Sequence, residues 1–162
     1  MFTDAGNFQN KKGEPNMSDT IRIRMEKECE DLFPRKAHSS DAAWDLRSRV
    51  SLELPVGRST LVPTGVFMEL PENYEAQVRP RSGLALKHDL MLTNSPGTID
   101  AGYRGEVGVI MYNGGTAPYK IERGDRIAQM VICKLPDVTL ELCDTLTDSD
   151  RGEGGFGSSG KK

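Results

Sequence analysis

Residues 94–106 combine side chains that could act on a small polar ligand; they read Asn-Ser-Pro-Gly-Thr-Ile-Asp-Ala-Gly-Tyr-Arg-Gly-Glu. Asp100 supplies a carboxylate, Tyr103 supplies a flat ring, and the glycines leave backbone donors and acceptors accessible. The apolar run 107–112 follows directly, so the segment is a turn at the end of a strand. We interpret it as a binding or catalytic loop. The alternative is a plain β-hairpin turn in which Asp and Gly serve the turn alone.

Three further segments carry candidate site residues. In residues 79–85, Arg-Pro-Arg-Ser-Gly-Leu-Ala, two guanidinium groups and a hydroxyl precede a short helical turn and could converge on a phosphate. In residues 124–129, Gly-Asp-Arg-Ile-Ala-Gln, a strand would place the polar Gln129 among apolar neighbours. Residues 42–48 would form another strand, in which Asp45 points away from Trp44 and Leu46, toward either a site or solvent.

The glycine-rich tail, residues 149–162, cannot form an element of a packed core. Its successive N–H groups could instead fold around an anion, with Arg151 and two serines, Ser158 and Ser159, as further donors. A flexible linker is the alternative, although the lone Phe156 fits it less well. The tail also matches two nucleotide-binding patterns formally, but neither match has the strand and helix that such loops require.

The composition argues against several classes of partner and compartment. A net charge of −3 gives no basic surface for a nucleic-acid duplex, so we expect no direct binding of nucleic acid. There is no apolar run of about 18 residues to span a membrane, and the N-terminus does not resemble a secretory signal. Three cysteines without metal-ligand spacing are typical of free thiols in the cytoplasm. Since only 36% of the residues are hydrophobic, we expect oligomerisation to support a thin core.

The elements that must position these side chains are short strands. Ile21, Ile23 and Met25 alternate with charged residues, as in a half-buried strand. Similar runs bounded by turn residues follow at 51–54, 60–62, 65–70, 74–78, 107–112, 119–122, 126–134 and 139–142. Only residues 83–87 favour a helix, and a short one. This pattern predicts a single all-β domain, a sandwich, barrel or jelly roll.

Taken together and in order, five segments resemble the five motifs of the trimeric dUTP pyrophosphatase (dUTPase) family. They read Ala-Ala-Trp-Asp-Leu, Pro-Arg-Ser-Gly-Leu-Ala, Gly-Thr-Ile-Asp-Ala-Gly-Tyr-Arg-Gly, Gly-Asp-Arg-Ile-Ala-Gln and Arg-Gly-Glu-Gly-Gly-Phe-Gly-Ser-Ser-Gly. The resemblance covers residues 21–160. Ala43 stands in place of a usual glycine and Ser159 in place of a more frequent threonine, but neither change removes a functional group.

The resemblance implies an all-β, jelly-roll-like subunit with one short helix, a homotrimer, and active sites each assembled from all three chains. It implies a β domain (21–148) and a flexible arm (149–162) that closes over the active site. Residues 1–20 lie outside the resemblance; they are polar and show no periodicity, so we expect a disordered N-terminal arm. The resemblance further implies hydrolysis of dUTP to dUMP and pyrophosphate by attack of water on the α-phosphorus. This reaction would keep dUTP out of DNA and supply dUMP for thymidylate synthesis.

The resemblance also implies roles for the residues at matching positions. Asp100 would be the general base, Tyr103 would lie under the deoxyribose and exclude a ribose 2′-hydroxyl, and Asp45 would hold waters of a Mg²⁺ bound mainly by the triphosphate. Asn94 and the backbone near Gly108 would read the uracil. The implied substrate-binding residues are Arg81, Ser82, Gly83, Asn94, Gly97, Thr98, Ile99, Tyr103, Gly108, Gln129, Arg151, Phe156, Gly157, Ser158 and Ser159.

Two alternative functions differ in class from this hydrolase. A dCTP deaminase of the same superfamily would share the fold. The deaminases that this chain resembles have a catalytic Glu on the strand after residues 94–106, at the position where this chain has Ile110. They also typically read Arg-Ser-Ser where this chain reads Arg-Ser-Gly. A dUTP-responsive regulatory protein, acting on a protein partner, would leave no reliable mark in the sequence.

Overall fold

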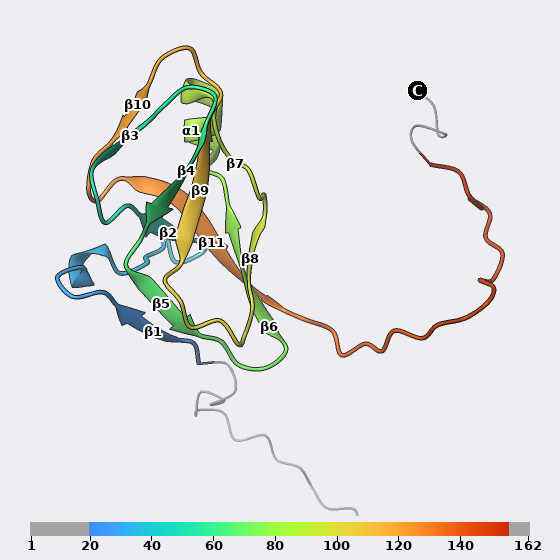
Figure 1. The fold of residues 1–162 in the computed structure, drawn as a ribbon. Coiled ribbons are helices and arrows are strands. Elements are labelled where there is room, and N and C mark those ends of the chain that lie inside the picture. The colour runs from blue at the N-terminus through green and yellow to red at the C-terminus, as the bar shows by residue number, and fades with distance from the viewer. Residues whose placement is uncertain (1–19, 156–162) are drawn as a thin grey trace, which may run out of the picture.

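The computed structural model describes residues 20–155, which form a body of short β-strands and an extended segment that leaves it (Figure 1). The strands pair antiparallel in four small sheets, and one short α-helix lies at an end of the body. This jelly-roll-like arrangement confirms the predicted all-β class. The expected N-terminal arm, apart from Thr20, and the tail beyond Gly155 lie outside the described residues.

The largest sheet contains four strands in the order β2-β11-β6-β8. Their bounds are Trp44–Arg47 (β2), Tyr74–Arg79 (β6), Gly97–Ile99 (β8) and Arg126–Lys134 (β11). Gln129 on β11 stands opposite Asp45 on β2 and Arg79 on β6. The register of this sheet therefore brings three of the motif segments side by side.

A second sheet has the order β4-β9-β7, and two strand pairs, β1-β5 and β10-β3, complete the body. Their bounds are Arg22–Met25 (β1), Leu52–Leu54 (β3), Ser59–Pro63 (β4), Val66–Glu69 (β5), Leu90–Leu92 (β7), Gly108–Asn113 (β9) and Tyr119–Ile121 (β10). The helix α1 spans Ser82–His88 and a 3-10 turn, η2, spans Glu30–Leu32. The predicted helix and every predicted strand before Lys134 are confirmed. Within residues 20–155, no helix has the length and apolar character needed to cross a membrane.

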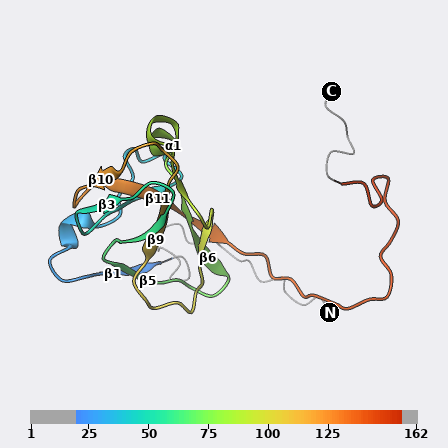
Figure 2. The same ribbon diagram turned by 45° about the horizontal axis from the view of Figure 1, so that its top comes forward.

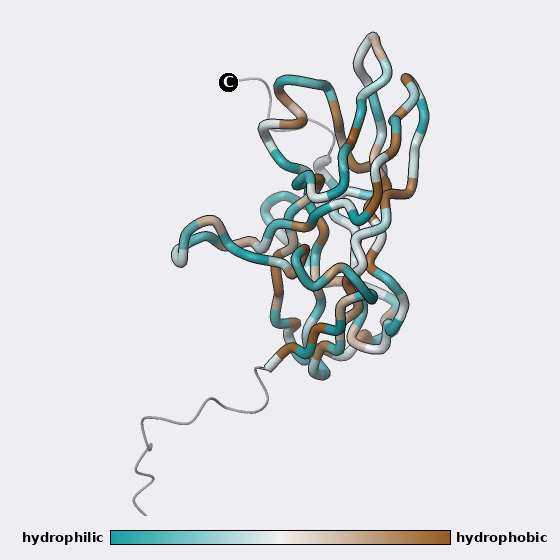
Figure 3. Tube along the Cα trace, turned by 90° about the vertical axis from the view of Figure 1, so that its left-hand side faces the viewer, coloured by the Kyte–Doolittle hydropathy of each residue, from teal (hydrophilic) through white to brown (hydrophobic). Residues whose placement is uncertain are grey.

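The core is built from apolar side chains of the strands. The colours along the trace in Figure 3 show hydrophobic residues interspersed with hydrophilic ones in the body. In β9, Val109 and Met111 are buried, whereas Ile110 and Tyr112 lie half-buried on the opposite face. The largest fully buried apolar side chains are Leu46, Leu54, Leu90, Met111, Ile121 and Ile127. Asn113 is also buried, and its amide donates to the carbonyls of Leu54 and Ala117 at 2.9 Å each. This core fixes the strand ends, which carry the motif segments.

The prediction of a strand at residues 139–142 is wrong for the single chain. After Lys134 the backbone leaves the body and runs away from it (Figure 2), so these residues pair with no strand within residues 20–155. Their apolar side chains point into solvent, with Leu140 95% and Leu142 99% exposed. The sequence pattern also missed β7 and β8, because β7 reads Leu-Met-Leu without alternation of apolar and polar residues and β8 begins with a glycine.

Residues 94–106 are not a hairpin turn. The strand before the turn, β8, pairs with β6, whereas the strand after it, β9, pairs with β4 and β7. The chain after Ile99 therefore crosses from one sheet to another. The alternative interpretation of this segment as a plain hairpin turn is wrong, because the two flanking strands do not pair with each other within residues 20–155.

Candidate active site

A polar hollow with a volume of about 400 Å³ lies where β2, β11 and the start of α1 meet; we call it the arginine hollow. It brings together five residues that the sequence singled out, namely Asp45, Arg81, Ser82, Gly83 and Gln129. Arg79, the other arginine of the 79–85 segment, also lines it, as do two charged residues to which the sequence assigned no role, Asp41 and Arg126. The predicted cluster of phosphate-binding groups is thus present on one chain.

Asp45 forms ion pairs with two of the arginines that line this hollow. Its Oδ1 lies 3.3 Å from Nε of Arg81, and its Oδ2 lies 3.2 Å from NH1 of Arg126. The Asp45 side chain is only 18% exposed, so two guanidinium groups balance a carboxylate that is largely shielded from water. This arrangement keeps both arginines directed into the hollow.

The loop before α1 is fixed to β11 by side-chain hydrogen bonds. Gln129 donates from Nε2 to the carbonyl of Pro80 at 2.8 Å, and Arg81 donates from NH1 to the carbonyl of Arg126 at 2.9 Å. Arg81 has an extended backbone, and the helix starts at the next residue, Ser82. Gln129, a polar residue among apolar neighbours, therefore holds the loop in place as well as lining the hollow.

A second hollow, with a volume of about 280 Å³, lies inside the crossing segment; we call it the turn hollow. Its lining residues are Leu61, Thr98, Ile99, Asp100, Tyr103, Glu106, Gly108 and Ile110. Five of these were predicted, while Leu61, Glu106 and Ile110 were not assigned to the site. A Cβ atom at Gly108 would lie 2.6 Å from Cδ1 of Leu61, so any other residue there would require the exposed Leu61 side chain to move.

The crossing segment is held by its own hydrogen bonds. Tyr103 donates its N–H to the carbonyl of Asp100 at 3.0 Å and its hydroxyl to the carbonyl of Glu106 at 2.9 Å. Arg104 donates from NH1 to the carbonyl of Ala101 at 2.6 Å. Asp100 is exposed and its carboxylate accepts no hydrogen bond from residues 20–155. The turn hollow thus pairs a fixed ring with an accessible carboxylate.

Glu106 closes the crossing segment with an ion pair. Its carboxylate accepts hydrogen bonds from Nε of Arg49 at 2.8 Å and from the N–H of Gly65 at 2.7 Å. Burial favours the protonated acid, but these hydrogen bonds and the charge of Arg49 outweigh it and hold the pKa of Glu106 below its ordinary value of 4.5. Glu106 is therefore a structural anion rather than a proton acceptor near neutrality.

Asn94 and Gly97 stand at the start of the crossing segment. Asn94 does not line either hollow in the single chain. A Cβ atom at Gly97 would lie 3.1 Å from Nδ2 of Asn94 and 3.5 Å from Cβ of Val78, so the buried Gly97 lets β8 approach β6 closely. The predicted role of Asn94 in reading a base stays a prediction.

The two hollows have no lining residue in common. On β6, Arg79 stands opposite Gln129 of the arginine hollow, whereas Ala76, three residues earlier, stands opposite Ile99 of the turn hollow. At a rise of ~3.3 Å per residue, this register separates the two groups by about 10 Å along the strand. One chain therefore presents two separate hollows.

The predicted residues of the tail stand apart from both hollows. Arg151, on the segment that leaves the body, donates from Nε to the carbonyl of Gly154 at 2.7 Å and lines neither hollow. The other predicted tail residues, Phe156, Gly157, Ser158 and Ser159, lie outside the described residues. Their role as a closing arm stays a prediction.

Within residues 20–155, no three His, Cys, Asp or Glu side chains are grouped as metal ligands. The arginine hollow offers Asp45, whose two oxygens both contact arginines, and Asp41, whose Oδ2 accepts the N–H of His38 at 2.8 Å. Such a donor set does not hold a metal by itself. It fits a magnesium ion bound mainly by substrate oxygens and water, with one carboxylate behind the waters.

Comparisons with known proteins agree with one another. The family model described as dUTPase matches residues 31–160. Among curated proteins, a deoxyuridine 5′-triphosphate nucleotidohydrolase of Gloeothece citriformis is 54% identical over 129 residues, covering 80% of this chain and 89% of that protein. One of the same name from Clostridium tetani is 50% identical over 142 residues, covering 88% of this chain and 97% of that protein.

Solved structures with the same fold are phage dUTPases. A mutant dUTPase of Staphylococcus bacteriophage 80alpha with dUpNHpp superposes with a TM-score of 0.81 at 28% identity, covering 87% of this chain and 98% of that one. A mutant dUTPase of phage phi11 of S. aureus, described with a structural Mg(II) ion, gives a TM-score of 0.72 at 25% identity, covering 78% of this chain and 98% of that one. Sequence and fold thus point to the same group of proteins.

Proposed function

Because this chain belongs to the dUTPase family, it is an enzyme that hydrolyses dUTP to dUMP and pyrophosphate, and we propose that the turn hollow of one copy and the arginine hollow of another form each active site. The observation that carries this proposal is the pair of half-sites: one chain has the accessible Asp100 in one hollow and the clustered arginines in another. Neither hollow alone offers both a proton acceptor and a phosphate site.

The turn hollow would bind the deoxyuridine. Asp100 takes the proton of the water that attacks the α-phosphorus, a role that suits an exposed carboxylate without a protein partner in residues 20–155. Tyr103 lies under the deoxyribose, where a ribose 2′-hydroxyl has no room. The backbone at residues 97–99 and at Gly108, together with Asn94, reads the uracil, since a wrong base leaves buried polar groups unpaired.

The arginine hollow would bind the triphosphate. Arg81, Ser82, Gly83 and Gln129 contact the phosphates, which carry about four negative charges near neutrality. Asp45 holds the guanidinium groups in place and offers an oxygen to waters of a Mg²⁺ ion carried by the substrate. When bound, this ion would neutralise part of the phosphate charge.

The arm at residues 149–162 would close over the bound nucleotide. Arg151, Ser158 and Ser159 would contact the γ-phosphate, Gly157 would contact the substrate through its backbone, and Phe156 would stack on the uracil. The support is that the described part of this arm stands off the body of its own chain, where it covers neither hollow (Figure 1). Closure would exclude water from the reacting atoms.

A homotrimer would supply the missing half of each site. Val138, Leu140 and Leu142 form an alternating apolar stripe that is 69%, 95% and 99% exposed on the segment after β11. An apolar groove of about 390 Å³ beside β1 is not filled by residues 20–155; it is lined by Ile21, Ile23, Phe33, Pro34, Trp44, Tyr74, Met130 and Ile132. Stripe and groove match in chemistry, which supports exchange of this segment between copies.

The cytoplasm would be the place of this reaction. Cys29, Cys133 and Cys143 are all free thiols, a state that a reducing compartment maintains. Neither the substrate nor the proposed site requires nucleic acid, a membrane or a protein partner.

Release of pyrophosphate from dUTP, dTTP, dCTP and UTP in the presence of Mg²⁺ tests the proposal. We expect turnover with dUTP and at least about 100-fold lower kcat/KM with each of the others. Ammonia release from dCTP would indicate the deaminase instead. Equal turnover of dUTP and UTP would contradict the role of Tyr103.

A further inference from the structure

Arg49 and Glu106 form a half-buried ion pair at the end of the crossing segment. Nε of Arg49 lies 2.8 Å from Oε1 of Glu106 and NH2 lies 3.2 Å from Oε2, so each carboxylate oxygen accepts a hydrogen bond from one guanidinium nitrogen. The two side chains are 33% and 24% exposed. Arg49 lies outside the five motif segments, and Glu106 directly follows the third.

The carboxylate of Glu106 also joins the crossing segment to the turn between β4 and β5. Gly65 donates its N–H to Oε1 at 2.7 Å, and the next backbone contact, from the N–H of Val107 to the carbonyl of Val66, measures 2.8 Å. Thr64 donates its hydroxyl to the carbonyl of Val107 at 2.5 Å. Side chain and backbone together fix where residue 106 lies.

The backbone carbonyl of this fixed residue holds Tyr103. The Tyr103 hydroxyl donates to this carbonyl at 2.9 Å. The backbone N–H of Tyr103 donates to the backbone carbonyl of Asp100. Tyr103 is 43% exposed, so packing covers only part of the ring. The hydroxyl bond therefore does much to determine where the ring stands in the turn hollow.

We propose that Arg49 and Glu106 are a positioning pair that sets the discrimination against ribonucleotides by fixing the Tyr103 ring. The proposal rests on the proposed function of Tyr103 under the deoxyribose. Steric exclusion of a ribose 2′-hydroxyl requires that the Tyr103 ring be held rigidly in place. Loss of the pair lets residue 106, its carbonyl and the ring move together, and the extra oxygen then fits.

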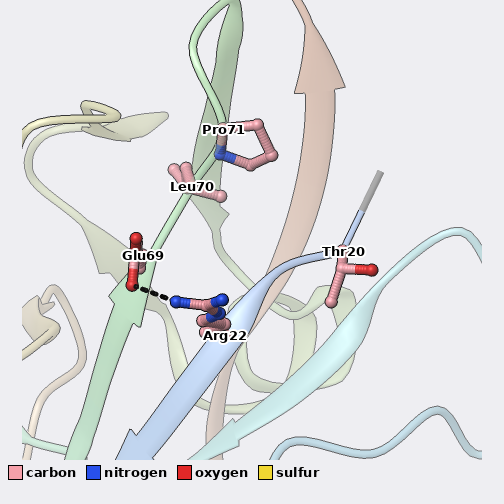
Figure 4. A pocket seen from close by; sticks show the side chains of 5 residues that line it. All are labelled: Thr20, Arg22, Glu69, Leu70 and Pro71. Carbon is pink, nitrogen blue, oxygen red and sulfur yellow. Dashed lines mark ion pairs between the residues drawn. The ribbon is translucent and has the colours of Figure 1, made fainter. Parts of the chain in front are cut away.

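The test compares UTP with dUTP in an Arg49→Ala variant. We expect kcat/KM for UTP relative to dUTP to rise about tenfold, with KM for dUTP raised and kcat changed less than about threefold. Arg22→Ala is the matched control, because Arg22 forms the other arginine–glutamate pair between strand segments, with Glu69 at 3.6 Å (Figure 4). That pair is 76% and 50% exposed and lines a different pocket, so the ratio should not change.

Tyr103→Phe provides a second variant that removes only the hydroxyl. It should raise the UTP ratio as Arg49→Ala does, and the double variant should show no further increase, because both changes break one chain of contacts. An unchanged ratio in Tyr103→Phe, or in a folded Arg49→Ala protein, overturns the inference. A wild-type protein without dUTP hydrolysis would instead overturn the proposed function.

Discussion

Three carboxylates of this protein have the same chemistry but different surroundings, and the surroundings decide what each can do. Asp100 is exposed and accepts no hydrogen bond from residues 20–155, so it is open to a water molecule. Asp45 is shared by two arginines, and Glu106 is locked by Arg49 and Gly65. A general base must be open to the attacking water, and of these three carboxylates only Asp100 has no hydrogen-bond or ion-pair partner among residues 20–155.

Asp100→Asn should therefore remove catalysis while keeping the shape of the turn hollow. We expect kcat for dUTP to fall at least about 100-fold, because the amide cannot take the proton of the attacking water. Affinity for a non-hydrolysable dUTP analogue, measured by calorimetry, should change less than about threefold. Turnover at the wild-type rate would rule out Asp100 as the base.

The lowered pKa of Glu106 predicts a stability that depends on pH. Near neutrality the ionised carboxylate contributes about 1 kcal/mol to the free energy of unfolding. As the pH falls below the ordinary value of 4.5, the unfolded chain takes up the proton first, so this contribution declines until the folded pKa is passed. The difference in melting temperature between wild type and Glu106→Gln should thus shrink in acid. A difference that is constant with pH would contradict the assignment.

Ten of the residues named by the motif resemblance line the two hollows, five in each. Other residues that shape these hollows could not be found from the sequence. Leu61 reaches Gly108 because β4 pairs with β9 in a register that sets Leu61 opposite Ile110. Arg49 and Glu106 are separated by 57 positions. No local pattern encodes such contacts, since they depend on which strands pair.

Among the elements, strands that alternate over four or more residues were predictable, because one face of each is buried. The three-residue strands β7 and β8 were not. Residues 139–142 show the converse error: the pattern favours a strand, but the described part of the chain provides no strand with which they could form hydrogen bonds. Periodicity reports the preference of a segment and not the presence of its neighbour.

The turn between β4 and β5 gives a prediction at this scale. Gly65 has a φ of +74°, and a Cβ atom there would lie 3.1 Å from Cβ of Cys29. Gly57 has a φ of +71° with open space around it, so Gly57→Ala measures the backbone cost alone. We expect Gly57→Ala to destabilise by about 1 kcal/mol and Gly65→Ala by about 2–3 kcal/mol in urea unfolding. Equal losses would mean that Cys29 moves aside freely.

For the whole molecule, the segment after β11 is the feature that a single chain leaves unexplained. It exposes leucines, while the apolar groove beside β1 is not covered by any segment within residues 20–155. Exposure of these two apolar surfaces to water is unfavourable, and contact between copies would bury both of them. Composition alone suggested an oligomer, but only the coordinates locate the surfaces that could form it.

Two truncations separate assembly from closure. A chain ending at Asp148 should stay trimeric in sedimentation equilibrium but lose most turnover, because the closing arm is gone. A chain ending at Lys134 should also lose the exposed apolar stripe, and with it the trimer. A trimer formed by the shorter chain would show that other surfaces hold the copies together.

The separation of the two hollows on one chain also has a genetic consequence. Under the proposed assembly, a chain without Asp100 still lends an intact arginine hollow to its neighbour, and a chain without Arg81 still lends an intact turn hollow. Two alleles that are each inactive can then restore some activity when expressed in the same cell. Conversely, a defective chain that assembles with wild-type chains also inactivates the site that it shares with a wild-type neighbour.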